Sequence, residues 1–252
     1  MALDFLRGRT ALITGGNRGL GKAMAAALAS AGAQLALVAR DEGALASAAA
    51  DIRANGTTVE AYPADVTDEM QVRKLETSVL ARFGRVDILV NNAGINVRRT
   101  VAEFSLEDWN RVIATNLTSA FLLCRSFVPA MKGRGYGRIL NLTSTMSHVS
   151  LPGRAAYSAS KTGLLGFTRA LALELAAEGI TVVAISPGPF ATEMNAPLIQ
   201  DPTLNAEFIA RIPVGRWGQV KEVGQLALFL CSPDAGFITG VDILIDGGWT
   251  AQ

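Results

Sequence analysis

The chain has 252 residues, of which 50% are hydrophobic and 18% charged, and its 23 basic and 22 acidic side chains leave a formal net charge of +1. This balance excludes a disordered chain, and no cluster of Lys and Arg interleaved with aromatic residues indicates a nucleic-acid partner. We expect one domain over residues 1–252 with a sizeable core, although the length would also permit two.

The N-terminal segment MALDFLRGRT does not read as a signal peptide, because Asp4 and Arg7 interrupt its short apolar patch. We find no run of transmembrane length, so we expect a cytoplasmic protein with no membrane partner. Cys124 and Cys231 are the only cysteines, and each lies in a helix-like apolar segment. We expect both in the core, with neither a disulfide nor a metal site.

Apolar runs typical of strands alternate with helical patterns along the chain. Strands are predicted at Thr10–Thr14, Gln34–Ala39, Thr58–Tyr62, Val86–Asn91, Arg138–Leu142, Thr181–Ile185 and Val241–Ile245. Helices are predicted at about 20–31, 42–54, 68–82, 106–131, 157–178 and 220–231. This alternation predicts a doubly wound α/β fold, with a seven-stranded parallel sheet and helices on both faces. The irregular stretch Ser186–Gln219 predicts a binding loop or lid.

A glycine-rich loop follows the first predicted strand and reads TGGNRGLG over residues 14–21. Glycines permit a tight turn and close approach to a pyrophosphate, and the N-terminus of the following helix offers unpaired N–H groups. Alone, such a loop could be a flexible turn, but its place between strand and helix favours dinucleotide binding. In a parallel sheet the ligand lies at the carboxyl ends of the strands, where Asn91, Ser144 and Pro187 also fall.

Tyr157 and Lys161 stand four residues apart in a helical pattern, and Ser144 follows the strand-like run Arg138–Leu142. The spacing places the two helical side chains on one face. We expect the ammonium to lower the pKa of the phenol from ~10 toward neutrality, which would make Tyr157 an acid or base. The simpler alternative is a surface tyrosine with a lysine at i+4.

Ordered motifs over nearly the whole chain resemble the short-chain dehydrogenase/reductase family. They are Thr14-Gly15-x-x-x-Gly19-x-Gly21, Asp65-Val66, Asn91-Asn92-Ala93-Gly94, Asn116, Ser144, Tyr157-x-x-x-Lys161 and Pro187-Gly188. The resemblance implies a single-domain Rossmann fold. The chain departs from the family at Val183, where an asparagine often stands.

The resemblance also implies roles for four residues. Tyr157 would be the general acid or base, and Lys161 would hold the nicotinamide ribose and lower the pKa of the tyrosine. Ser144 would orient the substrate carbonyl, and Asn116 would support a water-linked proton relay. The cofactor residues would be Gly15, Asn17, Arg18, Gly19, Leu20, Gly21, Arg40, Asp65, Val66, Asn92, Ala93, Gly94, Tyr157, Lys161, Pro187, Gly188, Phe190 and Thr192.

The end of the second strand favours NADP(H) over NAD(H). Members of the family specific for NAD place an acidic residue there, whereas this chain has Ala39 followed by Arg40, with Arg18 in the glycine loop. A planar guanidinium binds a 2′-phosphate well. Alternatively, Arg40 pairs with Asp41, Arg18 is merely solvated, or Asp41 binds a 2′-hydroxyl.

Two stretches resemble gluconate 5-dehydrogenase-like members: residues 96–99, and residues 190–217 with Met194. Arg98 or Arg99 could hold the carboxylate of a sugar acid, although either could be solvated or in a subunit contact. His148, the only histidine, is expected in the pocket wall. The candidate substrate residues are Arg98, Arg99, Ser144, Thr145, His148 and Met194.

Three functions therefore stay open. The first is an NADP(H)-dependent oxidoreductase that interconverts a ketone and a secondary alcohol, on a sugar acid or polyol. The second is a 3-oxoacyl-[acyl-carrier-protein] reductase, which predicts a basic docking patch of Arg125, Lys132, Arg134 and Arg169. The third is a catalytically idle NADP(H)-binding sensor or scaffold. The resemblance implies a homotetramer, or a homodimer, with residues 106–131, 157–178 and the C-terminal strand at its contacts.

Overall fold

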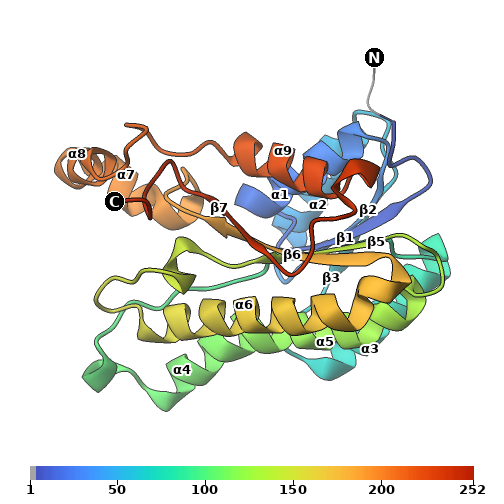
Figure 1. Ribbon diagram of the computed structural model, residues 1–252, viewed down its shortest axis with the longest axis horizontal. Helices are drawn as coiled ribbons and strands as arrows, with labels where there is room; N and C mark the ends of the chain where they lie inside the picture. The colour runs from blue at the N-terminus through green and yellow to red at the C-terminus, as the bar shows by residue number, and fades with distance from the viewer. Residues whose placement is uncertain (1–3) are drawn as a thin grey trace.

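Seven parallel strands form one sheet in the order β3-β2-β1-β4-β5-β6-β7. The computed structural model describes residues 4–252 apart from the side chain of Met194. In it the sheet lies between two layers of helices (Figure 1), which confirms the doubly wound α/β prediction. The strands are β1 Thr10–Thr14, β2 Gln34–Ala39, β3 Val59–Pro63, β4 Ile88–Asn91, β5 Gly137–Leu142, β6 Ile180–Pro187 and β7 Asp242–Ile245.

The central strands are mostly apolar and buried throughout, because both of their faces are covered. Every residue of β1, β4, β5 and β6 is buried, as a parallel sheet with helices on both faces requires. The chain order reverses between β1 and β4, which pair in parallel from Ala11 with Ile88 to Ile13 with Val90. Ligands of open α/β sheets bind at the carboxyl ends of the strands beside such a reversal.

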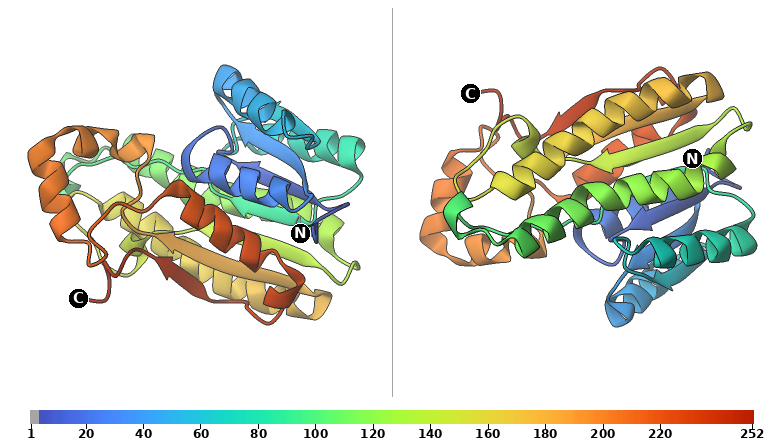
Figure 2. Two further views of the ribbon diagram at one scale, coloured as in Figure 1. Left: turned by 90° about the horizontal axis from the view of Figure 1, so that it is seen from above. Right: turned by 90° about the horizontal axis from the view of Figure 1, so that it is seen from below.

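Two apolar clusters hold the helices to the sheet, one on each face. One face carries α1 (Gly19–Ser30), α2 (Glu42–Arg53) and α9 (Val220–Leu230), and the other carries α3 (Glu69–Phe83), α4 (Leu106–Ile113), α5 (Ser119–Met131) and α6 (Ala155–Leu175) (Figures 1 and 2). Cys124 and Cys231 are free and buried, as expected, and burial raises the pKa of both thiols to about 12.

We had expected one regular helix over residues 106–131, but the structure interrupts it. A π-helical turn, Ala114–Thr118, joins α4 to α5 and places Asn116 in the wide turn. By length and composition alone, the helical run Leu106–Met131 is long and apolar enough to cross a membrane. This corrects our prediction that the chain has no run of transmembrane length. However, 56% of its most apolar window is buried inside the protein, as in the core helix of a globular protein.

The stretch between β6 and α9 contains more regular structure than its Pro and Gly content suggests. A 3₁₀ turn, Glu193–Asn195, leads into α7 (Ala196–Gln200) and α8 (Pro202–Ala210). Asp201 caps α8 by accepting hydrogen bonds from the N–H groups of Thr203 and Leu204. Figure 2 shows α7 and α8 together at one end of the molecule, beyond the carboxyl end of β6.

Candidate active site

A cleft of about 680 Å³ opens at the carboxyl ends of the strands. It is lined by loops that follow β1, β2, β4, β5 and β6, so the topology brings the separate sequence motifs together. The predicted residues that line it are Gly15, Asn17, Arg18, Gly19, Leu20, Arg40, Asp65, Val66, Asn92, Ala93, Gly94, Arg98, Ser144, Thr145, Tyr157, Lys161, Pro187, Gly188, Phe190 and Thr192. Gly21 and Asn116 are buried and do not line it.

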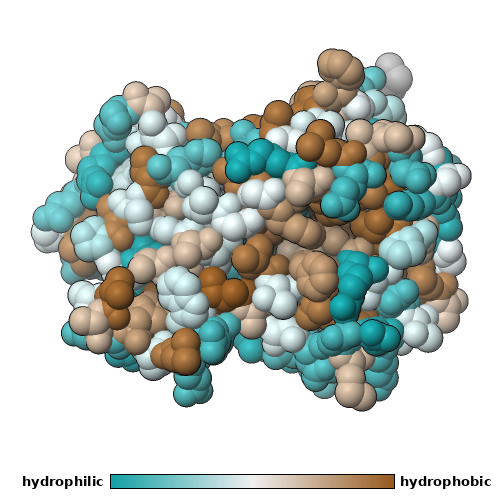
Figure 3. Space-filling view, turned by 60° about the horizontal axis from the view of Figure 1, so that its bottom comes forward, coloured by the Kyte–Doolittle hydropathy of each residue, from teal (hydrophilic) through white to brown (hydrophobic). Residues whose placement is uncertain are grey.

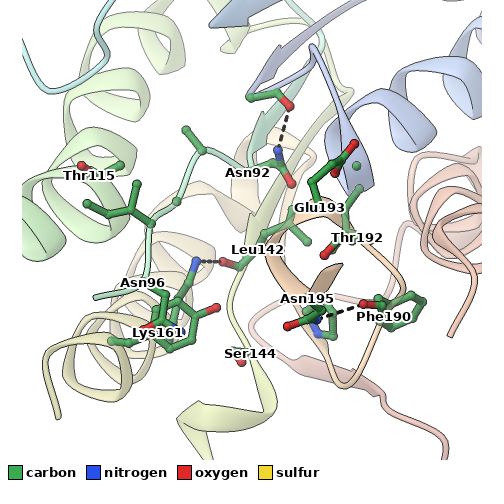
Figure 4. Close-up of a pocket in the computed structure, with 18 of the residues that line it drawn as sticks. Asn92, Asn96, Thr115, Leu142, Ser144, Lys161, Phe190, Thr192, Glu193 and Asn195 are labelled. Atoms are coloured by element: carbon green, nitrogen blue, oxygen red, sulfur yellow. Dashed lines mark hydrogen bonds between the residues drawn. The ribbon is translucent and has the colours of Figure 1, made fainter. Parts of the chain in front are cut away.

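The glycine loop is closely packed against the loop after β4. A Cβ atom on Gly15 would lie 2.7 Å from Nδ2 of Asn92, and one on Gly21 would lie 2.2 Å from the carbonyl oxygen of Gly15. Asn92 donates from Nδ2 to the carbonyl of Thr14 at 2.8 Å (Figure 4). Among the side chains that the structure describes, none caps the first N–H groups of α1, so a dinucleotide pyrophosphate fits this cradle.

Two exposed cations, Arg18 and Arg40, line the cleft beside this loop. Asp41 does not pair with Arg40, because its carboxylate caps α2 by accepting from the N–H of Ala44 at 3.0 Å. Arg40 instead lies 3.7 Å from Asp65, a separation that leaves its guanidinium able to reach a second anion. Within residues 4–252, Arg18 forms no ion pair.

Tyr157 and Lys161 project from α6 into the cleft, next to the end of β5. The ammonium of Lys161 is buried and donates to the carbonyl of Leu142 at 2.5 Å (Figure 4). Its Nζ atom lies 5.7 Å from the centre of the Tyr157 ring. Ser144, which follows β5, lies close enough to the phenol of Tyr157 to act on the pKa of that hydroxyl. The predicted triad is therefore assembled.

The protonation states differ from our expectation. Burial raises the pKa of Tyr157, whereas the hydrogen bond from Ser144 and the charge of Arg154 act in the opposite direction. The expected lowering by Lys161 is not found, because the ammonium faces the Leu142 carbonyl and desolvation of the phenol is larger. Burial also lowers the pKa of Lys161 to about 8. At neutral pH the phenol therefore holds its proton, and most of the amine is charged.

Asn116 connects two walls of the cleft. Its Oδ1 accepts from the N–H of Ile95 at 2.8 Å, and its Nδ2 donates to the carbonyl of Ile95 and to Oγ of Ser160, both at 3.0 Å. A Cβ atom on Gly94 would lie 3.4 Å from Oδ1 of Asn116 and 3.5 Å from Nζ of Lys161. The amide thus fixes the loop after β4 to α6, and its part in a proton relay stays a prediction.

On the substrate side the structure places one predicted arginine outside the cleft and shows another arginine in its lining. Arg99 does not line the cleft, and its Nε lies 3.5 Å from Asp108. Arg154, which sequence reasoning missed, lines the cleft three residues before Tyr157. Burial and the nearby charge of Arg98 lower the pKa of Arg154. No motif marks Arg154, so its position directly before the helix of Tyr157 was the only signal.

Two further predictions for the substrate side have different outcomes. His148 does not line the cleft, so its place in the pocket wall is wrong; its imidazole pairs with Asp242 instead. Met194 lies in the 3₁₀ turn Glu193–Asn195, and its side chain is outside the described part of the structure.

Side chains that no motif marked complete the cleft. Asn96 lines it with a buried Oδ1 atom that has no hydrogen-bond partner in the described part of the chain. From α8, Phe208 stacks on Trp217 and on Trp249 with ring centroids 5.2 Å apart in each pair. Phe208 and Trp249 both line the cleft, so α8 meets the C-terminal segment there.

Comparison with known proteins agrees with this geometry. A family model described as enoyl-(acyl carrier protein) reductase matches residues 15–250. A 3-oxoacyl-[acyl-carrier-protein] reductase from Synechocystis sp. is 41% identical over 96% of this chain and 97% of its own length. A D-beta-hydroxybutyrate dehydrogenase from Rhizobium meliloti is 38% identical over 97% of this chain and 99% of its own length.

A solved structure has the same fold. The gluconate 5-dehydrogenase from Burkholderia cenocepacia J2315, in complex with NADP and tartrate, aligns over 100% of both chains with a TM-score of 0.93 and 37% sequence identity. These three proteins all align with nearly the whole of this chain and differ in their printed names. Substrate identity must therefore be argued from the side chains of this cleft.

Proposed function

The chain belongs to the short-chain dehydrogenase/reductase family, and from this premise we propose that it is an NADP(H)-dependent oxidoreductase acting on a substrate that carries a carboxylate. The reaction interconverts a ketone and a secondary alcohol, with a sugar acid as the favoured substrate and a polyol as the alternative. The intact Ser144, Tyr157 and Lys161 argue against an idle sensor or scaffold.

The observation that supports a carboxylated substrate is the pair of arginines beside Tyr157. Arg98 and Arg154 line the cleft close enough for the charge of one to lower the pKa of the other. Among the described residues neither forms an ion pair with a carboxylate. Two close cations without an anion favour a ligand that supplies one, and a guanidinium binds a carboxylate through two parallel hydrogen bonds. The relative solved with tartrate, a dicarboxylate, supports this interpretation.

The residues of the nucleotide side fit NADP(H). The uncapped start of α1 and the glycine cradle suit a pyrophosphate, and Arg18 with Arg40 suits a 2′-phosphate. The relative solved with NADP supports this choice. When bound, the cofactor supplies or accepts the hydride, and Asn92, Lys161 and Thr192 line the cleft where its nicotinamide half would lie.

The catalytic residues of the chain transfer a proton to the substrate and stabilise the negative charge that remains on Tyr157. Tyr157 holds its proton at neutral pH and donates it from its hydroxyl oxygen when an alkoxide develops on the substrate. Ser144 orients the carbonyl, and the charged Lys161 stabilises the phenolate that remains. In the direction of oxidation the same phenolate takes the proton back.

We test the substrate class with NADPH and matched pairs of keto acids and neutral ketones, following absorbance of the nicotinamide. We expect the acids to be reduced with a kcat/KM about 100-fold higher, because each charge-assisted pair contributes about 1.5–3 kcal/mol. The double variant Arg98→Gln/Arg154→Gln should remove this preference, whereas the control Arg99→Gln should keep it. Equal rates for acids and neutral ketones would exclude a carboxylate subsite, and no turnover of any ketone would favour the idle binder.

Reduction of a 3-oxoacyl group on acyl carrier protein is the second candidate, favoured by the 41% identity to such a reductase. The basic patch it predicts is partly neutralised. Arg125 pairs with Glu69 at 2.7 Å, and Lys132 lies 4.0 Å from Glu178. A 3-oxoacyl thioester in the same assay tests this candidate, and its reduction faster than any keto acid would favour it.

We also infer a homotetramer in the cytoplasm. Leu106, Phe121 and Leu173 are exposed on the layer of α4, α5 and α6. Figure 3 shows apolar side chains gathered across the face on this side of the molecule, which supports contacts between copies of the chain. The proposed soluble dinucleotide cofactor supports a cytoplasmic location.

A further inference from the structure

A buried carboxylate lies behind the turn that carries Ser144. Asp242, the first residue of β7, has a side chain that is only 7% exposed, and its Oδ2 lies 2.5 Å from Nε2 of His148. The hydroxyls of Ser186 and Thr143 lie 2.7 and 3.2 Å from the same carboxylate. None of the steps described above uses this group. We call Thr143, His148, Ser186 and Asp242 the Asp242 network.

The Asp242 network holds both ends of the Ser144 turn. Ser144 opens the 3₁₀ turn Thr145–Ser147, and His148 closes it by donating its N–H to the carbonyl of Thr145 at 3.0 Å. At the start of the turn, Oγ of Ser186 lies 3.1 Å from the carbonyl of Ser144. At its end, the imidazole of His148 reaches Asp242. One carboxylate from β7 is thus connected to both ends.

The number of available protons explains why a histidine matters here. Ser186 has one hydroxyl proton and three acceptors within reach, the Ser144 carbonyl, Asp242 and Oγ1 of Thr143. Thr143 likewise can donate to the carbonyl of Ile185, to Oγ of Ser186, both at 2.8 Å, or to Asp242. If the N–H of His148 satisfies the carboxylate, both hydroxyls can donate to the backbone. Without it, the buried carboxylate would take these protons, because an unpaired buried charge is costly.

Within residues 4–252, His148 is also the one side chain that brings a nitrogen atom within hydrogen-bond distance of this carboxylate. Among residues 4–252, no lysine or arginine forms an ion pair with Asp242. The imidazole is about one-third exposed, so it can be replaced without opening the core. The carboxylate depends on this single nitrogen donor and on two hydroxyls, of which that of Ser186 also reaches the Ser144 carbonyl.

We propose that His148 and Asp242 are positioning residues for Ser144. By satisfying Asp242, His148 leaves the proton of Ser186 for the Ser144 carbonyl and fixes the hydroxyl of Ser144 toward the phenol of Tyr157. This inference rests on the proposed function, because it takes Ser144 as the group that orients the substrate carbonyl. A small displacement of an orienting group slows chemistry far more than it weakens binding.

Two variants of His148 test the proposal through activity. His148→Leu removes the N–H donor, and we expect kcat to fall about tenfold while the Kd for NADPH stays within twofold. His148→Gln keeps an N–H donor and should retain kcat within about twofold. The double variant His148→Leu/Asp242→Leu should be no slower than His148→Leu, because the unpaired carboxylate is gone. An unchanged kcat in His148→Leu, or equal losses in the Gln and Leu variants, would overturn the proposal.

A spectroscopic measurement separates this proposal from the proposed function. The chain has one histidine, so ¹⁵N NMR of the imidazole reports on His148 alone. We expect a proton on Nε2 that exchanges slowly with water and becomes fast-exchanging in Asp242→Leu. A proton on Nδ1 alone would overturn the proposal even if His148→Leu failed to fold. A parent protein that shows the slow Nε2 proton but reduces no ketone would contradict the proposed function instead.

Discussion

The nucleotide half of the cleft, around β1 and β2, and the catalytic half, around β4, β5 and β6, differ in how far their ionisable side chains are exposed to solvent. Arg18 and Arg40 are exposed on the nucleotide side. On the catalytic side Lys161 is buried and Tyr157 is partly buried, and their pKa values are shifted by that burial. An exposed cation can select a charged ligand at little cost to folding, whereas a buried group acquires altered proton affinity at the expense of stability.

Removing the phenol hydroxyl should give the largest effect and tests the catalytic half. Tyr157→Phe keeps the buried ring but removes the proton donor, so we expect kcat to fall about 1,000-fold, within the range for general acid catalysis. The Kd for NADPH, measured by fluorescence titration, should stay within about twofold. Tyr62→Phe in β3 is the matched control and should retain full activity. Residual turnover above one-tenth of the parent rate would mean that another group donates the proton.

The exposed arginines give the next largest effect and test the nucleotide half. In Arg18→Ala/Arg40→Ala we expect the Kd for NADPH to rise about 100-fold, because two charge-assisted contacts to a phosphate are lost. The Kd for NADH should change less than threefold, and the melting temperature should not fall. Arg73→Ala, an exposed arginine on α3, serves as the control. If both nucleotides lost affinity equally, the two cations would not distinguish a 2′-phosphate.

Replacing the buried Lys161 should give the smallest of the three effects, a change in stability. It tests whether a buried charged group on the catalytic side reduces the stability of the protein. The pKa of Lys161, about 8, lies below the ordinary value of 10.5, so the cost of burying the charged amine is present below pH 8 and disappears as the pH rises toward 10.5. Lys161→Met removes this cost but leaves the Leu142 carbonyl without its donor. We expect a net gain of about 1 kcal/mol at pH 7, or ~2–4 °C in melting temperature.

The pH dependence checks that explanation of Lys161→Met. The gain in melting temperature should vanish near pH 10, where the folded parent protein holds this amine neutral. The variant should also lose turnover. A variant that is less stable than the parent at pH 7 would show that the hydrogen bond to Leu142 outweighs the burial of the charge.

Sequence reasoning succeeded where a local pattern determines the structure. The bounds of β1 and β2 are those expected, because their apolar runs end at turn residues on both sides. The glycine loop, Asn92 and Tyr157 came together because parallel strands place their carboxyl ends at one edge. The Asp201-Pro202 pair in the lid is a helix-start signal that could have revealed α8.

The rest depended on contacts between distant segments. The π turn at Asn116 has no signal in an apolar run that reads as one helix, and it depends on hydrogen bonds to Ile95 and Ser160. The pKa of Tyr157 depends on how deeply the ring is buried, which spacing to Lys161 does not specify. Arg99 lies outside the cleft because Asp108, on α4, attracts it, and Arg154 lines the cleft although no motif marks it.

Two of the three tryptophans of the chain, Trp217 and Trp249, flank Phe208 where α8 meets the C-terminal segment. Indole emission is sensitive to stacking and to solvent, so the intrinsic fluorescence of this protein should report directly on any ligand that changes this stacking at the edge of the cleft. Ligand entry could then be timed in a stopped-flow instrument without attaching any dye.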